Sequence, residues 1–176
     1  MKRTTIAIAL VLWVFGAIAC VAQDAFMGTW KLTERKSEFS PGAPKNRTVV
    51  YEAQGDKVKI TVDSVSSDGR TTHYTWVGKF DGTNYPVAGD PNSDFRSYTV
   101  VDEHILGFNV TKGRKVINSG RIVVSADGKS RTVTMSGSDA NGHKFSSSEI
   151  YESSDGRRAA GNCPPANSET FSAVLH

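Results

Sequence analysis

The chain has 176 residues, of which 38% are hydrophobic and 22% charged, and its formal net charge at neutral pH is +3. Lys2 and Arg3 supply most of the excess, and without them the net charge is about +1. That balance leaves no basic patch of the kind that nucleic-acid binding requires. The length is sufficient for one domain with its own core.

Residues 1–22 have the three regions of a secretory signal peptide. Lys2 and Arg3 provide the positive start, an apolar run extends from Ile6 to Ala19, and small residues follow. A membrane span needs about 20 apolar residues, and no basic stop-transfer cluster follows this run. We therefore predict that the segment is removed on export and that the protein is secreted or periplasmic.

Two cleavage positions stay open, one before Cys20 and one before Gln23. Ala17 to Cys20 also resembles the lipobox of bacterial lipoproteins, which would place a lipid anchor on Cys20. Cleavage before Gln23 would leave Cys163 as the only cysteine. No intrachain disulfide could then form, although an oxidising compartment would permit one.

From Phe26 to Ser153 short runs rich in β-type residues alternate with turn dipeptides. Asn-Gly and Asp-Gly tolerate the positive φ that tight hairpins demand. The turn dipeptides are Gly55-Asp56, Asp68-Gly69, Asp81-Gly82, Lys112-Gly113, Asp127-Gly128, Asn141-Gly142 and Asp155-Gly156.

Apolar and polar residues alternate within the runs between these turns. The clearest cases are 57–63, 71–77, 105–111 and 131–135. A period of two with one polar side predicts an antiparallel sheet that packs on one face. Residues 31–40 have room for one turn of helix at most.

Long strands joined by tight hairpins predict a meander, and about eight to ten such strands close into a barrel without exposed edges. We therefore predict an all-β fold, a single antiparallel up-and-down β-barrel of about 8–10 strands over residues 23–154. An open β-sandwich is the alternative. An outer-membrane barrel is disfavoured, because its outer face must be apolar and this one would carry Lys57, Lys59 and Asp63.

Two stretches interrupt the strand pattern. Residues 84–94 contain two prolines and several turn-forming residues, which predicts a long loop. Residues 155–176 are rich in Ala, Ser, Asn and Pro, which predicts a disordered C-terminal tail.

No sequence motif for catalysis or cofactor binding is present. The chain lacks a nucleophile elbow, a zinc-protease motif, a phosphate-binding glycine loop and a Cys-x-x-Cys pair. Asp102-Glu103-His104 has the composition of a hairpin turn. The histidines are scattered, so we expect no metal site, no cofactor and no enzymatic activity. They are His73, His104, His143 and His176.

Gly28-Thr29-Trp30 follows a short apolar lead-in and opens the first predicted strand. It resembles the Gly-x-Trp start of lipocalins, which implies that Trp30 plugs the closed end of the barrel while Gly28 permits a close turn beneath it. Lipocalins pair this tryptophan with an arginine on the last strand, whereas the last predicted strand here, 144–152, contains Lys144 and no arginine.

The wider sequence is similar to a lipocalin-like family of exported bacterial proteins. GTWKLTERKSEFSPG at 28–42, YPVAGDPNSD at 85–94 and VVSADGKSRTVTMSG at 123–137 fit this family, and the resemblance covers roughly 26–152. It implies a monomeric barrel that binds a small apolar ligand, such as a lipid, in its lumen.

A barrel of about eight strands has an interior just wide enough for side chains or one small ligand. Arg96 and Tyr98 share one face of their strand, which the sequence does not assign to the inside or the outside, and on the inside they would hold a polar head group. The predicted lumen residues are Tyr74, Trp76, Phe108 and Met135.

A solid barrel is the alternative to a hollow one, since the same six side chains could fill a dry core. The protein would then act as an interaction module in the envelope or outside the cell. Its contact with another protein would be made by the loop 84–94 or the tail 155–176.

Overall fold

The computed structural model of the protein describes residues 23–41, 43–66, 69–138 and 142–155. The predicted signal peptide, nearly all of the predicted tail, and Cys163 lie outside these residues. The elements are β1 (Gly28–Leu32), η1 (Glu34–Lys36), β2 (Glu38–Phe39), β3 (Lys45–Gln54), β4 (Lys57–Val65), β5 (Thr71–Gly78), β6 (Tyr85–Ala88), β7 (Phe95–Asp102), β8 (Ile105–Lys112), β9 (Lys115–Val124), β10 (Ser130–Ser138) and β11 (Lys144–Ser153).

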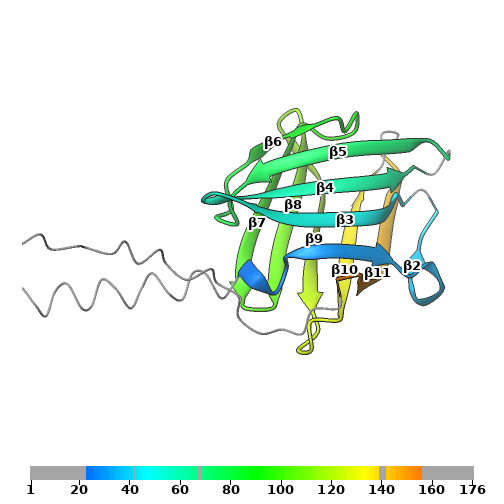
Figure 1. Cartoon of the computed structure of the whole chain (residues 1–176). Helices are drawn as coiled ribbons and strands as arrows, with labels where there is room; N and C mark the ends of the chain where they lie inside the picture. Colours follow the sequence, from blue (N-terminus) through cyan, green and yellow to red (C-terminus); the bar gives the residue numbers. More distant parts are fainter. Residues whose placement is uncertain (1–22, 42, 67–68, 139–141, 156–176) are drawn as a thin grey trace, which may run out of the picture.

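The strands form a closed antiparallel meander. From β3 to β11 each strand pairs with the next one along the chain, and β1 joins the two ends by pairing with both β3 and β11. The result is a 10-strand barrel, with the short β2 added beside β11. Figure 1 shows β3, β4 and β5 running across the direction of β8, β9 and β10. The predicted fold class is confirmed.

The alternation in the sequence determines which side chains point inward. In β4, Val58, Ile60 and Val62 are buried, whereas Lys57 is exposed. β4 is in register with β3 so that Ile60 lies opposite Tyr51, whose side chain is also buried. Side chains on alternate positions of a strand point to opposite faces, so one face of each strand forms the lumen.

The hairpins use glycine where the backbone must turn left-handed. Gly55 between β3 and β4 has φ 61°, and Gly113 between β8 and β9 has φ 60°. Glycine adopts this region without the penalty that a Cβ atom brings. These turns keep consecutive strands adjacent, as an up-and-down topology requires.

The prediction of a long loop at 84–94 is wrong in part, because this stretch contains β6. Thr75 and Trp76 of β5 pair with β6 on one side, and Tyr85 and Pro86 of β6 pair with β7 on the other. The edges of β5 and β7 would otherwise expose unpaired backbone groups within the wall, so a short strand forms in spite of its proline. The helical turn allowed within 31–40 is the 3₁₀ turn η1.

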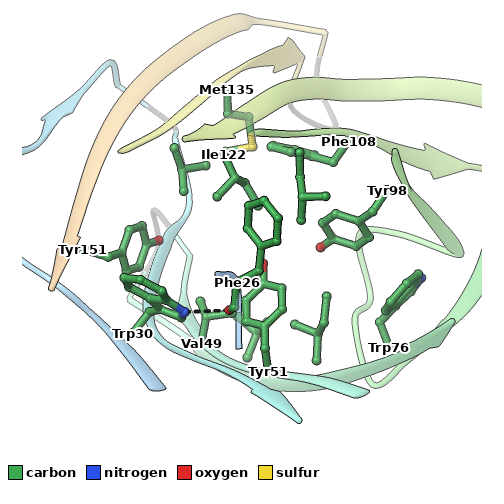
Figure 2. Packing of buried hydrophobic residues seen from close by; sticks show 14 of the residues in the cluster. Phe26, Trp30, Val49, Tyr51, Trp76, Tyr98, Phe108, Ile122, Met135 and Tyr151 are labelled. Carbon is green, nitrogen blue, oxygen red and sulfur yellow. Dashed lines mark hydrogen bonds between the residues drawn. The ribbon is translucent and has the colours of Figure 1, made fainter. Parts of the chain in front are cut away.

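The core lies inside the barrel and is rich in aromatic side chains. Trp76 stacks on Phe80 with a centroid separation of 6.3 Å, and meets Tyr98 edge-on at 4.8 Å. Figure 2 shows side chains from around the wall pointing into the shared interior. Among the described residues there is no helix long and apolar enough to cross a membrane.

Candidate ligand site in the barrel lumen

A cavity of about 100 Å³ lies inside the barrel. It is lined by side chains of β3 to β5 and β7 to β11, and by residues of the connection between β6 and β7. Sites for drug-sized ligands measure about 300–1,000 Å³, whereas an engineered cavity of about 150 Å³ holds benzene. The hollow is therefore suited to a small molecule, and a longer one requires side chains to move.

Five of the six residues predicted to contact a ligand line this cavity: Tyr74, Arg96, Tyr98, Phe108 and Met135. Trp76, the sixth, is not among the lining residues. Its indole is buried between other aromatic rings, and its Nε1–H donates to the backbone oxygen of Arg96 at 3.0 Å. Trp76 thus packs behind the cavity wall.

Arg96 already has a carboxylate partner. Its Nη2 lies 3.2 Å from Oδ2 of Asp90, and both side chains are largely buried. The same Asp90 oxygen accepts a hydrogen bond of 2.6 Å from the Ser93 hydroxyl. The guanidinium also lies over the Tyr74 ring, 4.5 Å from its centroid. A head group at Arg96 would therefore have to compete with Asp90.

A second arginine also lines the cavity. Arg131 on β10 is 2% exposed, and its guanidinium lies 4.9 Å from the Trp30 ring, 5.0 Å from Tyr51 and 4.7 Å from Tyr151. Its Nε and Nη1 atoms have no hydrogen-bond partner among the described residues. A buried donor without an acceptor costs free energy, so these atoms form an incomplete polar site.

Sequence reasoning missed Arg131, although its signal was present. In the alternating run 131–135, a period of two places Arg131 on the same face as Val133 and the predicted lumen residue Met135. The structure buries all three residues. A charged residue at an inward position of an alternating run is the pattern that identifies it.

Glu149 on β11 is a buried acid beside Arg131. It is 0% exposed, and its carboxylate accepts hydrogen bonds from the Ser147 hydroxyl at 2.9 Å and the Tyr151 hydroxyl at 2.5 Å. Tyr151 lies opposite Arg131, and Glu149 lies opposite Val133. Arg131 and Glu149 are therefore diagonal neighbours on the lumen face.

Burial raises the pKa of the Glu149 carboxyl, because the charged form loses its hydration. The hydrogen bonds from Tyr151 and Ser147 and the charge of Arg131 offset part of this rise. Burial also raises the pKa of Tyr151 well above its usual value, and the neighbouring Glu149 adds to the effect. The lumen thus contains an acid that burial biases toward its protonated form.

The Glu149 shift leads to a prediction for stability. A carboxyl whose pKa is raised in the folded state destabilises the fold as pH rises above its unfolded value of about 4.3. Glu149→Gln removes this titration, so the melting temperature of the variant relative to wild type should increase from pH 4 to pH 8. Thermal unfolding followed by circular dichroism measures the difference. A constant offset at all pH values would contradict a raised pKa.

Trp30 on β1 does not line the cavity, but it packs against Arg131, which does. Its side chain is 1% exposed, its Nε1–H donates to the backbone oxygen of Phe26 at 2.9 Å, and one ring face meets Arg131. Figure 2 shows Trp30 and Tyr151 on the same side of the interior, with the bond to Phe26 dashed. Gly28 has φ 98°, and a Cβ there would collide with the Asp155 carboxylate.

The described residues contain no group of three or more His, Cys, Asp or Glu side chains that could hold a metal ion. The charged groups on the cavity wall are instead two arginines and two carboxylates: Arg96, Arg131, Asp90 and Glu149.

Comparison with known proteins gives likenesses in structure and none in sequence. No family model and no curated protein matches the chain. Among solved structures, EF1p2_mFAP2b bound to DFHBI is 12% identical, with a TM-score of 0.47 over 75% of this chain and 96% of that one. A redesigned β-barrel, mFAP1, bound to DFHBI is 14% identical, with a TM-score of 0.42 over 74% of this chain and 97% of that one.

Proposed function

We propose that the protein is an exported, monomeric, lipocalin-like barrel that binds a small ligand with an apolar body in its lumen, and that it is not an enzyme. The observation that supports this proposal most is the cavity: about 100 Å³ lies within the barrel wall, among apolar, aromatic and polar side chains. The signal-like sequence of residues 1–22 supports export.

The cavity wall suits a ligand that combines an apolar body with polar atoms. Val62, Val110, Ile122 and Phe108 provide apolar surface, and each Å² of apolar surface removed from water contributes about 25 cal/mol. Polar side chains form much of the remaining wall, among them Asn118, Arg131 and Glu149. Because buried polar groups need hydrogen-bond partners, such a wall favours a ligand that carries polar atoms as well as an apolar body.

Filling the cavity tests the proposal. Val133 lines the hollow on β10, so Val133→Phe should occupy the space that a ligand needs. Hexyl alcohol, an uncharged probe with an apolar chain, should bind wild type and bind the variant at least about tenfold more weakly, a difference of about 1.4 kcal/mol. Changes in NMR chemical shift during titration measure both affinities.

A matched control places the same ring on the outside of the barrel. Thr132 is the neighbour of Val133 on β10 and does not line the cavity, so Thr132→Phe should bind the probe like wild type. Native mass spectrometry of the purified protein adds an independent observation, a co-purified small molecule. If wild type binds no probe and retains no molecule, the solid barrel acting as an interaction module replaces this proposal.

A further inference from the structure

The side chains that face the lumen leave an excess of hydrogen-bond donors. The buried cavity-lining atoms without a partner among the described residues are Nε and Nη1 of Arg131, Nε of Arg96 and Oδ1 of Asn118. Three of these four atoms are N–H donors. The interior therefore offers more unpaired donors than acceptors, which favours a ligand that accepts hydrogen bonds.

The surroundings of Arg131 preserve its charge. A guanidinium does not lose its proton in proteins, and three ring faces, those of Trp30, Tyr51 and Tyr151, stabilise the cation by cation–π attraction. Ring faces accept no conventional hydrogen bond for Nε and Nη1 in the described structure. Arg131 is thus a fixed, buried positive charge with two free donors beside a cavity.

Arg131 differs from Arg96 in its access to a ligand. Arg96 is bound to Asp90 at 3.2 Å. Close to Arg131 the nearby acid is Glu149, whose oxygens take hydrogen bonds from Ser147 and Tyr151. A new oxyanion at Arg131 would therefore displace no bonded carboxylate, and it reaches the two buried donors once the side chains that cover them shift.

We propose that Arg131 binds the oxyanion of a short, apolar-bodied acid in the lumen, and that this anion binds together with a proton on Glu149. The proposal rests on the proposed lumen site and identifies the class of its ligand. A carboxylate is the simplest such group, and the size of the cavity limits the apolar body to a short chain or one small ring.

The coupling to a proton follows from charge balance in the lumen. When Glu149 is ionised, it compensates Arg131, and an added anion would face a buried carboxylate of the same sign. When Glu149 is protonated, Arg131 is the uncompensated charge and attracts the anion. Like charges in a shared buried site disfavour simultaneous ionisation, so anion binding should take up one proton.

The groups that act on Glu149 come from several strands. Tyr151 and Ser147 on β11 donate hydrogen bonds to the carboxyl, and Arg131 on β10 acts on it by its charge. Tyr74 on β5 acts on Tyr151 in turn. Tyr51 on β3 contacts Arg131, and burial raises the pKa of this phenol to about 12, so it stays neutral. Glu149 is therefore the group whose protonation state we expect to change when the anion binds.

The test compares two probes of equal chain length, hexanesulfonate and hexyl alcohol. The sulfonate stays ionised throughout the pH range, so any pH dependence of its binding belongs to the protein. Its affinity for wild type should rise as pH falls through the titration of Glu149, by up to about tenfold per pH unit for one coupled proton. The affinity for the alcohol should change by less than about twofold.

Three variants assign the effect to residues. Arg131→Met should weaken sulfonate binding at least about tenfold, the effect of losing one charged hydrogen bond, and leave alcohol binding within about twofold. Glu149→Gln should bind the sulfonate with the tight, low-pH affinity at every pH. Arg121→Met is the control, because it removes one positive charge from an exposed position on β9 and should match wild type.

The outcomes separate this proposal from the proposed function. If neither probe binds wild type, the lumen site itself is wrong. If the alcohol binds and the sulfonate shows no pH dependence, or Glu149→Gln keeps the dependence of wild type, only the anion site is overturned. A loss confined to Arg96→Met would place the head group at Arg96 instead. Should Arg131→Met fail to fold, the Glu149→Gln comparison decides the proposal alone.

Discussion

Replacing Trp30 with alanine should lower the free energy of unfolding by about 3–5 kcal/mol, the usual cost of truncating a large buried aromatic side chain. The indole is 1% exposed and its Nε1–H is bonded to Phe26. Its loss would also remove one of the three rings over Arg131. Urea unfolding monitored by circular dichroism measures the change.

Lys31→Ala is the matched control for this experiment. Lys31 follows Trp30 on β1 and its side chain is exposed, so its truncation should change stability by less than about 0.5 kcal/mol. A loss below about 1 kcal/mol for Trp30→Ala would show that the indole does not plug the barrel.

Gly120→Ala should also destabilise strongly, by about 1–3 kcal/mol or more, because it overpacks a closed site. Gly120 on β9 lies between Phe108 of β8 and Met135 of β10 in the register of the sheet. An added Cβ would overlap the backbone oxygen of Thr134 and lie 2.7 Å from the Phe108 ring. The overlapped oxygen belongs to the main chain, so β9 and β10 must separate to relieve it.

The control for Gly120→Ala is another strand glycine. A Cβ at Gly107 on β8 would meet its nearest neighbour, a methyl group of Val101, at an ordinary 3.8 Å. Gly107→Ala should therefore be neutral or slightly stabilising, since alanine restricts the unfolded chain. Similar melting temperatures for both variants would refute the close packing at Gly120.

Most of the fold follows from local sequence because each strand carries its own signal. Alternation in 57–63 marks the buried face of β4, and Gly55-Asp56 and Lys112-Gly113 mark hairpins that the structure contains. A meander joins neighbours in sequence, so local signals also determine the topology. β6 was missed because its four residues form a strand only through pairing with β5 and β7.

The candidate site was harder to predict than the fold. Periodicity predicts inward faces for Phe108 and Met135 and puts Tyr98 on the same face as Arg96 without fixing which face that is, and the structure places all of them on the cavity wall. Periodicity does not show how far along the barrel a side chain lies, and Trp76 packs behind that wall. The pairing of Arg96 with Asp90 depends on how the connection after β6 folds, which alternation does not encode.

Arg131 and Glu149 show a second limit of prediction from sequence. Both occupy inward positions on their strands, but a search for familiar catalytic or metal motifs passes over them, because an arginine and an acid on separate strands have no fixed spacing in sequence. Their proximity depends on the register of β10 against β11, which places Tyr151 opposite Arg131. Lipocalins pair the tryptophan with an arginine on the last strand. Here the arginine that packs on the Trp30 ring is Arg131 of β10, the strand before the last one.

Because β6 is short, the backbone pairing between strands is uneven around the barrel wall. β4 and β5 pair continuously from Val58 with Gly78 to Val65 with Thr71, whereas β6 pairs with β5 only at Thr75 and Trp76. Segments with few backbone hydrogen bonds open at lower free energy than the rest of a domain. The sector of the wall around β6 is therefore expected to open more easily than the rest. The connection that follows β6 contains Asp90, which lines the cavity and binds Arg96. Transient fraying of this sector would admit a molecule to the interior while the remaining strands stay paired.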